Sequence, residues 1–505
     1  MTGAARGPAV EAGFARRCGA HDAERAEAAH RVAQRLSAGD IRRVRLAWCD
    51  LHGVTRCKTL MPHAALRALD EGVGLAGTLA LKDTSDRTAL PVFDADASPP
   101  GFANGANLVL LPDPGTFATL PWSPQTAWML GDAFHADARA CEADTRRVLA
   151  RQARRLREAG WTLRCGLEVE FHVYRLVADG SHLDPQAAGW PGPAPRVALL
   201  HPGYRLLSEE SADAAHEALE CIEATALGLG LPLASLEVEF GPSQFEAVFD
   251  AVDAAQAADH MVLFRTAVRQ ALARRGYLAS FACRPPFASV MSSGWHLHQS
   301  IVDATGRNAF SLPADGRAGG SAGADPACLG APTRTGLSPL GERWLAGLMA
   351  HAQGACLLGT PTANGYGRFR PGALAPTQVR WGQDDRAALL RVLADGGGPA
   401  ARIENRLGEP AANPYLYVAS QIASGLDGLE RDASLAEAEA LHGGRALPAD
   451  LGQAIGAFET DAVMRAALGP TLSRALRAAK ALEWSRRSQA EDTDEFDRRE
   501  YFGRG

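Results

Sequence analysis

Two glutamates, Glu168 and Glu170, stand two positions apart in the segment LEVEFHVY of residues 167–174. Its alternating apolar and polar residues predict a β-strand, in which residues two apart share a face. Two carboxylates on one face repel each other unless a cation lies between them, so the pair could hold a divalent metal ion. A solvated sheet face is the alternative that this segment alone leaves open.

Two further segments offer the same kind of chemistry. Residues 237–246, EVEFGPSQFE, supply more carboxylates around a Gly-Pro turn, and residues 293–300, SGWHLHQS, place His296 and His298 on one strand face. A single histidine is more often structural than a metal ligand. An HxH strand beside two ExE segments nevertheless favours a metal site, because imidazole is a common metal ligand.

Arginines gather in the C-terminal half of the chain. The segment ARIENR places Arg402, Glu404 and Arg406 on one strand face, which suits a ladder of structural ion pairs or a metal-binding carboxylate flanked by phosphate-binding arginines. Further arginines lie upstream, at positions 368, 370, 380, 386 and 391. Divalent cations and several arginines together are the equipment for phosphoryl transfer. The chain has no GxxxxGK[ST] loop, which excludes a Walker-type NTPase.

Composition narrows the class of protein. The 505 residues, 46% hydrophobic and 22% charged, are typical of a globular protein with two or three domains. A net charge of −6 gives no argument for binding nucleic acid or an anionic membrane, and we find no apolar run long enough for a transmembrane helix. The nine cysteines are scattered singly and no secretory signal is visible, so we expect no disulfide scaffold, no zinc ribbon and a cytoplasmic location.

The helices and strands that must position these residues can be outlined from hydrophobic periodicity and from residues that end helices and strands. A hairpin is expected over residues 41–60, and the segment 312–336 is low in complexity, which predicts a surface loop or disordered insertion. Helices are expected at 22–36, 144–159, 211–228, 252–275, 414–430 and beyond 450, and strands at 163–176, 234–240 and 293–302. Strands interleaved with helices without regular βαβ spacing predict an α+β fold.

Taken in order, these segments resemble the glutamine synthetase superfamily over about residues 38–505. GLEVEF matches the family's GxExEF strand, EFGPSQFE its ExxPGQxE turn and SGWHLHQS its GSGxHxHxS strand; NGYGRFRPGALAP, WGQDDR and ARIENRLGEPAANPYL follow in family order. WCDLHGVTRCK looks like part of the family's β-grasp domain. The resemblance implies an N-terminal extension (1–37), a small β-grasp domain (38–138) and a large catalytic domain (139–505) with a curved antiparallel sheet and surrounding helices.

The resemblance also implies site residues. One divalent cation, Mg²⁺ or Mn²⁺, would be held by Glu170, Glu239 and Glu246, and another by Glu168, His296 and Glu404. Four positions would be catalytic: Arg368, Arg386, Arg406 and Asp50. Of these, Arg368 would bind a substrate carboxylate and Arg406 would bind the transferring phosphoryl group. ATP would be held by His298 and Ser300 on the nucleotide side and by Arg386 and Arg391 at its phosphates. Asp50 would be contributed to the site of a neighbouring subunit in a homo-oligomeric ring, a dodecamer by family resemblance.

The implied reaction is attack of the glutamate γ-carboxylate on ATP, followed by displacement of phosphate from γ-glutamyl phosphate by an amine. In ammonia-using members the flap NSYKRxxPGYEAP carries a glutamate that accepts a proton from ammonium, whereas this chain has Ala373 and Leu374 in place of Tyr-Glu. Leucine cannot accept a proton. Met291 and Ser292 also replace residues that touch the amino-acid end of glutamate.

We therefore expect an ATP-dependent ligase that joins glutamate to an organic amine, as in the γ-glutamylpolyamine and γ-glutamylamide ligases. An alkyl or aromatic monoamine is expected to be preferred to ammonium, with polyamines as the main competitor. The alternatives are an ammonia-using glutamine synthetase and a non-catalytic structural or regulatory relative, which loss of the metal carboxylates would mark.

Overall fold

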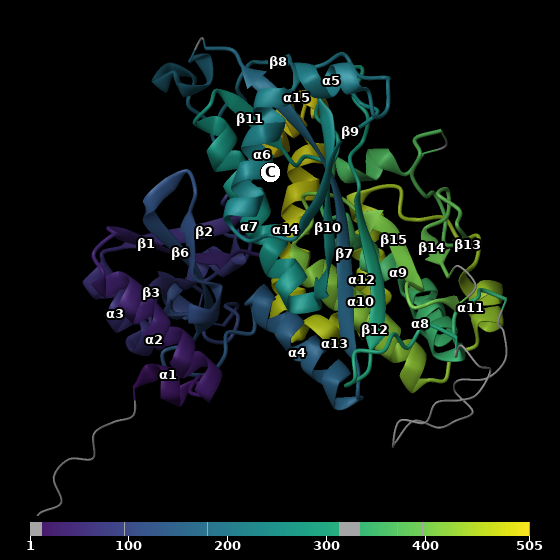
Figure 1. Ribbon diagram of the computed structural model, residues 1–505, viewed down its shortest axis with the longest axis horizontal. Helices are drawn as coiled ribbons and strands as arrows, with labels where there is room; N and C mark the ends of the chain where they lie inside the picture. The colour runs from purple at the N-terminus through teal and green to yellow at the C-terminus, as the bar shows by residue number, and fades with distance from the viewer. Residues whose placement is uncertain are drawn as a thin grey trace, which may run out of the picture.

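Two β-sheets organise the structure, a computed structural model that describes residues 13–94, 96–178, 180–312, 334–370, 372–394 and 397–503. The smaller sheet belongs to the N-terminal part, coloured purple to blue, and the larger one stands beside it in the rest of the chain (Figure 1). The limits of the extension and of the two domains predicted from the sequence stay a prediction.

The N-terminal sheet has six strands in the order β2-β1-β6-β4-β3, with β5 paired to β6. Its strands are β1 (Arg43–Cys49), β2 (Thr55–Leu60), β3 (Val73–Ala76), β4 (Asn107–Pro112), β5 (Ala118–Leu120) and β6 (Ser123–Phe134). Strands β1 and β2 are the predicted hairpin, and β1 pairs with β6 in parallel. Helices α1 (Phe14–Arg17), α2 (Ala23–Ser37) and α3 (Pro62–Glu71) accompany the sheet, and α2 buries Val32 and Leu36 in the same core. This is the expected β-grasp domain.

The larger sheet has nine strands in the order β13-β14-β15-β12-β7-β10-β9, with β8 and β11 also paired to β7. They are β7 (Thr162–Leu176), β8 (Val197–Leu199), β9 (Leu233–Val238), β10 (Gln244–Asp253), β11 (Tyr277–Ser280), β12 (Trp295–Val302), β13 (Trp381–Gln383), β14 (Leu390–Leu393) and β15 (Arg402–Gly408). Only β13 and β14 pair in parallel among these described strands. The expected antiparallel catalytic sheet is therefore confirmed, and it brings all the segments with candidate ligands onto adjacent strands.

Helices surround this sheet, and α10, α12 and α14 lie behind β7, β10 and β12 in the view of Figure 1. They are α4 (Thr145–Glu158), α5 (Glu209–Ala214), α6 (His216–Gly228), α7 (Ala254–Ala273), α8 (Pro339–Ala350), α9 (Ala352–Gly359), α10 (Pro414–Glu430), α11 (Leu435–His442), α12 (Leu451–Thr460), α13 (Ala462–Leu468), α14 (Pro470–Ser488) and α15 (Thr493–Asp497). The helix expected over 211–228 is divided at Ala215, between α5 and α6. Most of the low-complexity segment, residues 313–333, lies outside the described residues.

The C-terminal segment connects the two parts of the structure. Glu500, in the helical turn η9 (Arg498–Phe502), accepts a hydrogen bond of 2.6 Å from the hydroxyl of Ser85 in the N-terminal domain. Three residues earlier, Asp497 accepts one of 2.9 Å from Asn364 in the catalytic domain. A short stretch of backbone thus holds both domains through buried carboxylates, for which unpaired burial would be costly.

His351 forms a partly buried polar junction between the helices. Its Nδ1 lies 2.9 Å from Asp461 Oδ2 and its Nε2 lies 2.8 Å from Asp427 Oδ2. Burial alone would lower the pKa of this imidazole, but the two aspartates outweigh burial and raise it above the usual 6.5. The junction therefore favours a protonated histidine.

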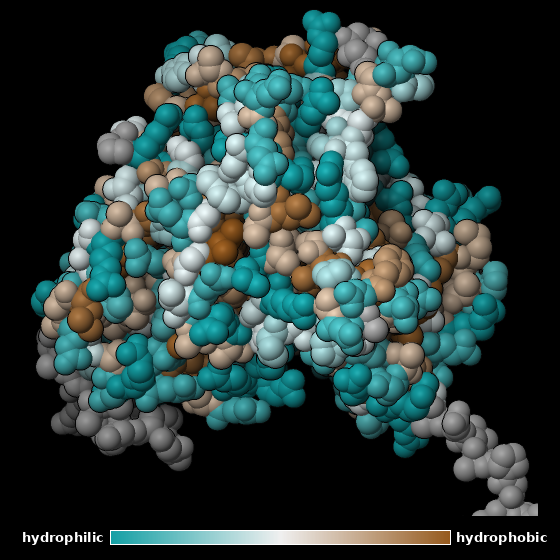
Figure 2. All heavy atoms as spheres, turned by 180° about the vertical axis from the view of Figure 1, so that it is seen from behind, coloured by the Kyte–Doolittle hydropathy of each residue, from teal (hydrophilic) through white to brown (hydrophobic). Residues whose placement is uncertain are grey.

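From behind, the surface is mostly hydrophilic, and hydrophobic residues form small separate patches (Figure 2). Among the described residues, none of the helices combines the length and apolar character needed to cross a membrane.

Candidate active site

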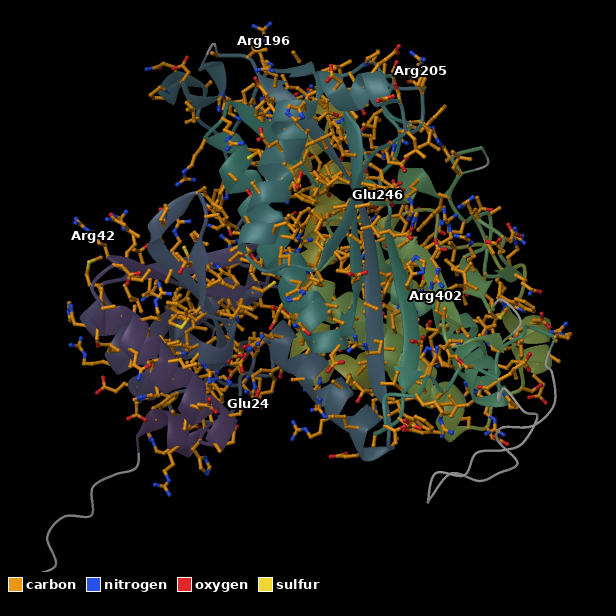
Figure 3. The ribbon with its side chains drawn as sticks, viewed as in Figure 1. Glu24, Arg42, Arg196, Arg205, Glu246 and Arg402 are labelled. Atoms are coloured by element: carbon orange, nitrogen blue, oxygen red, sulfur yellow. The ribbon has the colours of Figure 1, made fainter. Side chains whose placement is uncertain are left out.

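The register of the paired strands brings the predicted metal ligands close together. Across the sheet, Glu246 of β10 is paired with Glu170 of β7, and His296 of β12 is paired with Glu168 of β7. On the other side of β12, His298 is paired with Glu404 of β15. Figure 3 shows Glu246 in the upper part of the sheet and Arg402 of β15 farther down.

Glu168 lies between the two histidines. Its Oε1 is 2.8 Å from His298 Nε2, and its Oε2 is 3.4 Å from His296 Nδ1. Burial alone would raise the pKa of this carboxyl, yet the hydrogen bonds from the histidines hold it well below its usual value. Arg402 Nε donates to His298 Nδ1 at 3.1 Å, so the proton of a neutral His298 belongs on Nε2, where it faces Glu168.

Glu170, Glu239 and Glu246 form a group with excess negative charge. Burial and the neighbouring Glu239 raise the pKa of Glu170 to about 7, although the amide of Gly294 donates to it at 2.8 Å. Burial raises the pKa of Glu246 to about 9, and the carboxylates of Glu170, Glu168, Glu239 and Glu237 add to that rise. Within the described part of the chain, Glu246 accepts no hydrogen bond, so this carboxylate lacks a positive partner.

This donor set fits divalent cations, because a cation would offset carboxylates that otherwise must take up protons. Ligand atoms of Glu168, Glu246 and His296 lie within 4.8 Å of one another, as do those of Glu168, His298 and Glu404. The sequence-based grouping was different, since it assigned Glu246 to the other cation and His298 to ATP. Which residues bind which cation stays a prediction.

Arginines surround the fully buried Glu404. Arg391 Nη1 donates to Glu404 Oε2 at 2.8 Å, and Arg406 Nη1 donates to its other oxygen. Although burial opposes ionisation, the charges of His296 and Arg406 lower the pKa of Glu404. The site therefore combines ionised carboxylates with guanidinium groups that could bind phosphate oxygens.

Arg368 lies beside the cluster but is engaged by the backbone. It is only 3% exposed, and it donates to the carbonyls of Arg406 (2.9 Å), Leu407 (3.2 Å) and Gly408 (3.0 Å). A Cβ at Gly294 would come within 2.7 Å of Arg368 Nη2 and 3.0 Å of His296 Nε2, so glycine is required for this close approach. The expected role of Arg368 in binding a substrate carboxylate stays a prediction.

Gln244 has a positioning role that the sequence did not assign. Its Nε2 lies 3.3 Å from Glu170 Oε2, 3.2 Å from the carbonyl of Ser292 and 3.0 Å from Ser293 Oγ. Its Oε1 accepts from the amide of Gly241 at 2.9 Å. This 1% exposed amide joins β7, the loop before β12 and the turn before β10. Its place in EFGPSQFE, between two candidate carboxylates, was the available signal.

Three other predicted residues do not take part in the cluster of this chain. Asp50 is buried in the N-terminal domain, where it accepts hydrogen bonds from Arg56 (2.8 Å) and from the amides of His52 and Val54 (2.9 Å each). Arg386 is exposed in the loop between β13 and β14. Ser300 lies two residues beyond His298 on β12, where it is paired with Arg164.

A β-grasp domain joined to a curved sheet that bears carboxylates, histidines and arginines defines an ATP-dependent carboxylate–amine ligase. A sequence model described as the glutamine synthetase catalytic domain matches residues 142–499. The chain is 33% identical to a γ-glutamylanilide synthase of Acinetobacter sp. over 94% of this chain and 96% of that protein. The chain belongs to the glutamine synthetase family.

Two further comparisons agree with this membership. A γ-glutamylpolyamine synthetase of Streptomyces coelicolor is 31% identical, with 90% of this chain and 92% of that protein covered. The solved structure of a GmaS/ADP complex is 27% identical and superimposes with a TM-score of 0.71, covering 93% of this chain and 98% of that chain. Ligases of this family use ATP and a divalent metal ion.

Proposed function

We propose that this enzyme joins the γ-carboxylate of glutamate to an alkyl or aromatic monoamine, with ATP as the source of the activating phosphoryl group. The observation that carries the choice of amine is Leu374, which occupies the place of the family's flap glutamate and is 74% exposed. An exposed leucine can neither attract ammonium nor take its proton. It can contact the apolar part of an organic amine.

The printed functions of related proteins support an organic amine. Besides the anilide and polyamine synthetases, the chain is 29% identical to a glutamate–methylamine ligase of Methyloversatilis universalis, with 89% of this chain covered. Two of the three printed names, anilide and methylamine, refer to monoamines. We infer the same reaction type here, with an aromatic or alkyl acceptor.

The residues of the site suit each part of this reaction. Glu168, Glu170, Glu239, Glu246, His296 and Glu404 would hold two Mg²⁺ or Mn²⁺ ions, which when bound neutralise phosphate oxygens and the attacking carboxylate. Arg406 and Arg391, held by Glu404, would face the transferring phosphoryl group and the ATP phosphates. His298, Ser300 and Arg386 would complete the nucleotide side.

We also propose that the enzyme works as a homo-oligomeric ring. In this chain Asp50 lies in the N-terminal domain and bonds to Arg56, away from the carboxylate cluster. The support for this proposal is the family resemblance, in which the β-grasp domain of one subunit completes the catalytic site of its neighbour and Asp50 matches the contributed acidic position. A protein that is monomeric by light scattering and still fully active would contradict the shared site.

The test is ATP-dependent phosphate release with glutamate and a panel of ammonium, methylamine, aniline and putrescine. We expect a monoamine to give the highest kcat/KM, and Leu374→Glu to raise kcat/KM for ammonium while lowering it for the monoamine. A native enzyme that prefers ammonium would refute the proposed acceptor and support the ammonia-using alternative. No phosphate release with any amine would favour the non-catalytic alternative.

A further inference from the structure

His172 is a fully buried histidine on the strand face of β7 that also carries Glu168 and Glu170. Its ring stacks on Tyr174 with the centroids 5.9 Å apart, a contact that phenylalanine could make as well. Among the described residues, its one side-chain hydrogen bond joins Nδ1 to Ser293 Oγ at 3.3 Å, and Nε2 has no partner. A buried polar atom without a partner destabilises a fold, so packing alone does not account for a histidine at this position.

The direction of the hydrogen bonds around Ser293 follows from a backbone amide. The N–H of Gly241 donates to Gln244 Oε1 at 2.9 Å, which turns Gln244 Nε2 toward Ser293. Nε2 then donates to Ser293 Oγ at 3.0 Å, so the hydroxyl keeps its own hydrogen for His172 Nδ1. With Nδ1 as the acceptor, a neutral imidazole carries its hydrogen on Nε2. The histidine is therefore the final acceptor of a chain that starts at a backbone donor.

The same chain holds one oxygen of Glu170. Gln244 Nε2 lies 3.3 Å from Glu170 Oε2, and the amide of Gly294, the residue after Ser293, donates to that oxygen at 2.8 Å. The other oxygen, Oε1, lies 3.8 Å from Nε2 of His296, which is also a candidate ligand. Because two donors hold Oε2, Oε1 is the oxygen that remains for a cation.

We propose that His172 is a positioning residue for the metal site. By accepting the hydrogen of Ser293, it fixes the hydroxyl that Gln244 uses as an acceptor. Gln244 in turn holds Oε2 of Glu170, so that Oε1 faces the cation. The inference rests on the proposed function, in which Glu170 is a metal ligand, and deepens it. The unpaired Nε2 lowers the stability of the fold, so His172 serves the site at the expense of stability.

The experiment measures Mn²⁺ binding by calorimetry in the absence of ATP, glutamate and amine, at the site that Glu170→Ala weakens. His172→Phe removes the acceptor and keeps an aromatic ring on Tyr174, and it should raise the Kd for Mn²⁺ roughly 10- to 100-fold, as is typical when a partner of a metal ligand is lost. His172→Asn should stay within about threefold of the native Kd, because the asparagine Oδ1 can replace Nδ1 as the acceptor. Metal-free His172→Phe should unfold at a denaturant concentration no lower than the native protein, because the unpaired Nε2 is gone.

The matched control is His201→Phe. His201 is 3% exposed, and its ring packs against Phe245 with the centroids 5.1 Å apart. Within the described part of the chain, neither ring nitrogen has a hydrogen-bond partner. The same substitution there removes a buried imidazole that makes no hydrogen bond to Ser293, so the Kd for Mn²⁺ should stay native.

A double-mutant cycle tests whether the effect passes through Ser293. Ser293→Ala should weaken Mn²⁺ binding by itself, and His172→Phe should then add less than about twofold, because the two residues act as one unit. Additive losses would overturn the inference, as would a native Kd in His172→Phe or an equal loss in His172→Asn. If His172→Phe does not fold, Ser293→Ala decides, since a native Kd in that variant also overturns the inference. If Glu170→Ala leaves Mn²⁺ binding unchanged, the proposed metal site itself fails.

Discussion

Glu246 should destabilise the enzyme when divalent cations are removed. Its pKa is raised from 4.5 to about 9, so at pH 7 folding forces this carboxyl to keep a proton that it loses in the unfolded chain. The roughly 2.5 pH units between 4.5 and 7, at about 1.4 kcal/mol each, give a penalty of about 3 kcal/mol. Because the folded pKa of an acid is raised here, the penalty is absent below pH 4.5 and grows as pH rises toward 9.

The assay is chemical denaturation of the metal-free protein between pH 5 and 9, followed by titration with Mg²⁺ or Mn²⁺. Glu246→Gln removes the ionisable group at nearly constant volume, so in EDTA at pH 7 it should be more stable than the native protein by about 3 kcal/mol. Added cation should stabilise the native protein more than the variant. If the variant is less stable in EDTA, or if both respond equally to the cation, the charge argument is wrong.

Three further predictions concern other parts of the molecule. Glu170→Ala should abolish phosphate release and weaken Mg²⁺ binding, measured by calorimetry, while circular dichroism stays native. The stability contributed by His351, whose folded pKa is raised, should be complete below pH 6.5 and be lost as pH rises through the folded pKa. Between pH 6 and 9, the free energy of unfolding should therefore vary less with pH for His351→Gln than for the native protein. Arg391→Ala should lower kcat at least tenfold because it leaves the buried Glu404 with one arginine fewer. Replacement of the exposed Arg386 in Arg386→Ala should mainly raise KM for ATP. A larger loss of kcat in Arg386→Ala than in Arg391→Ala, measured by steady-state kinetics, would contradict this ranking.

The strands of the site could be predicted because their chemistry follows the strand period. Glu168 and Glu170, like His296 and His298, share a face by simple alternation, and the antiparallel order of β7, β10 and β12 then brings them together. The expected fold is confirmed for the same reason, since helices with clear caps and apolar faces begin and end near their predicted residues. The 414–430 helix, for instance, begins after Asn413, whose side chain caps it.

Other aspects depend on contacts that sequence spacing does not encode. The hydrogen bonds of Arg368 to the β15 carbonyls arise because the turn η7 (Gly365–Arg368) lies against that strand, although the two are far apart in the sequence. The helix expected over 211–228 is divided at Ala215, where the sequence has no glycine or proline that would indicate a break.

The C-terminal segment has a consequence for biosynthesis. Glu500 and Asp497 bond to Ser85 and Asn364, both of which leave the ribosome earlier. Because domains generally fold in order from the N-terminus during synthesis, the two domains can each become compact before the residues that fasten them are made. Arg265 and Asn413 already bond to the backbone carbonyls of Gly53 and Asp50, so the contacts of the C-terminal segment are added to an interface that exists before residue 500 is made. Nascent chains stalled before that point should therefore contain both domains in contact, and release of the last residues should add protection from protease around Ser85 and Asn364.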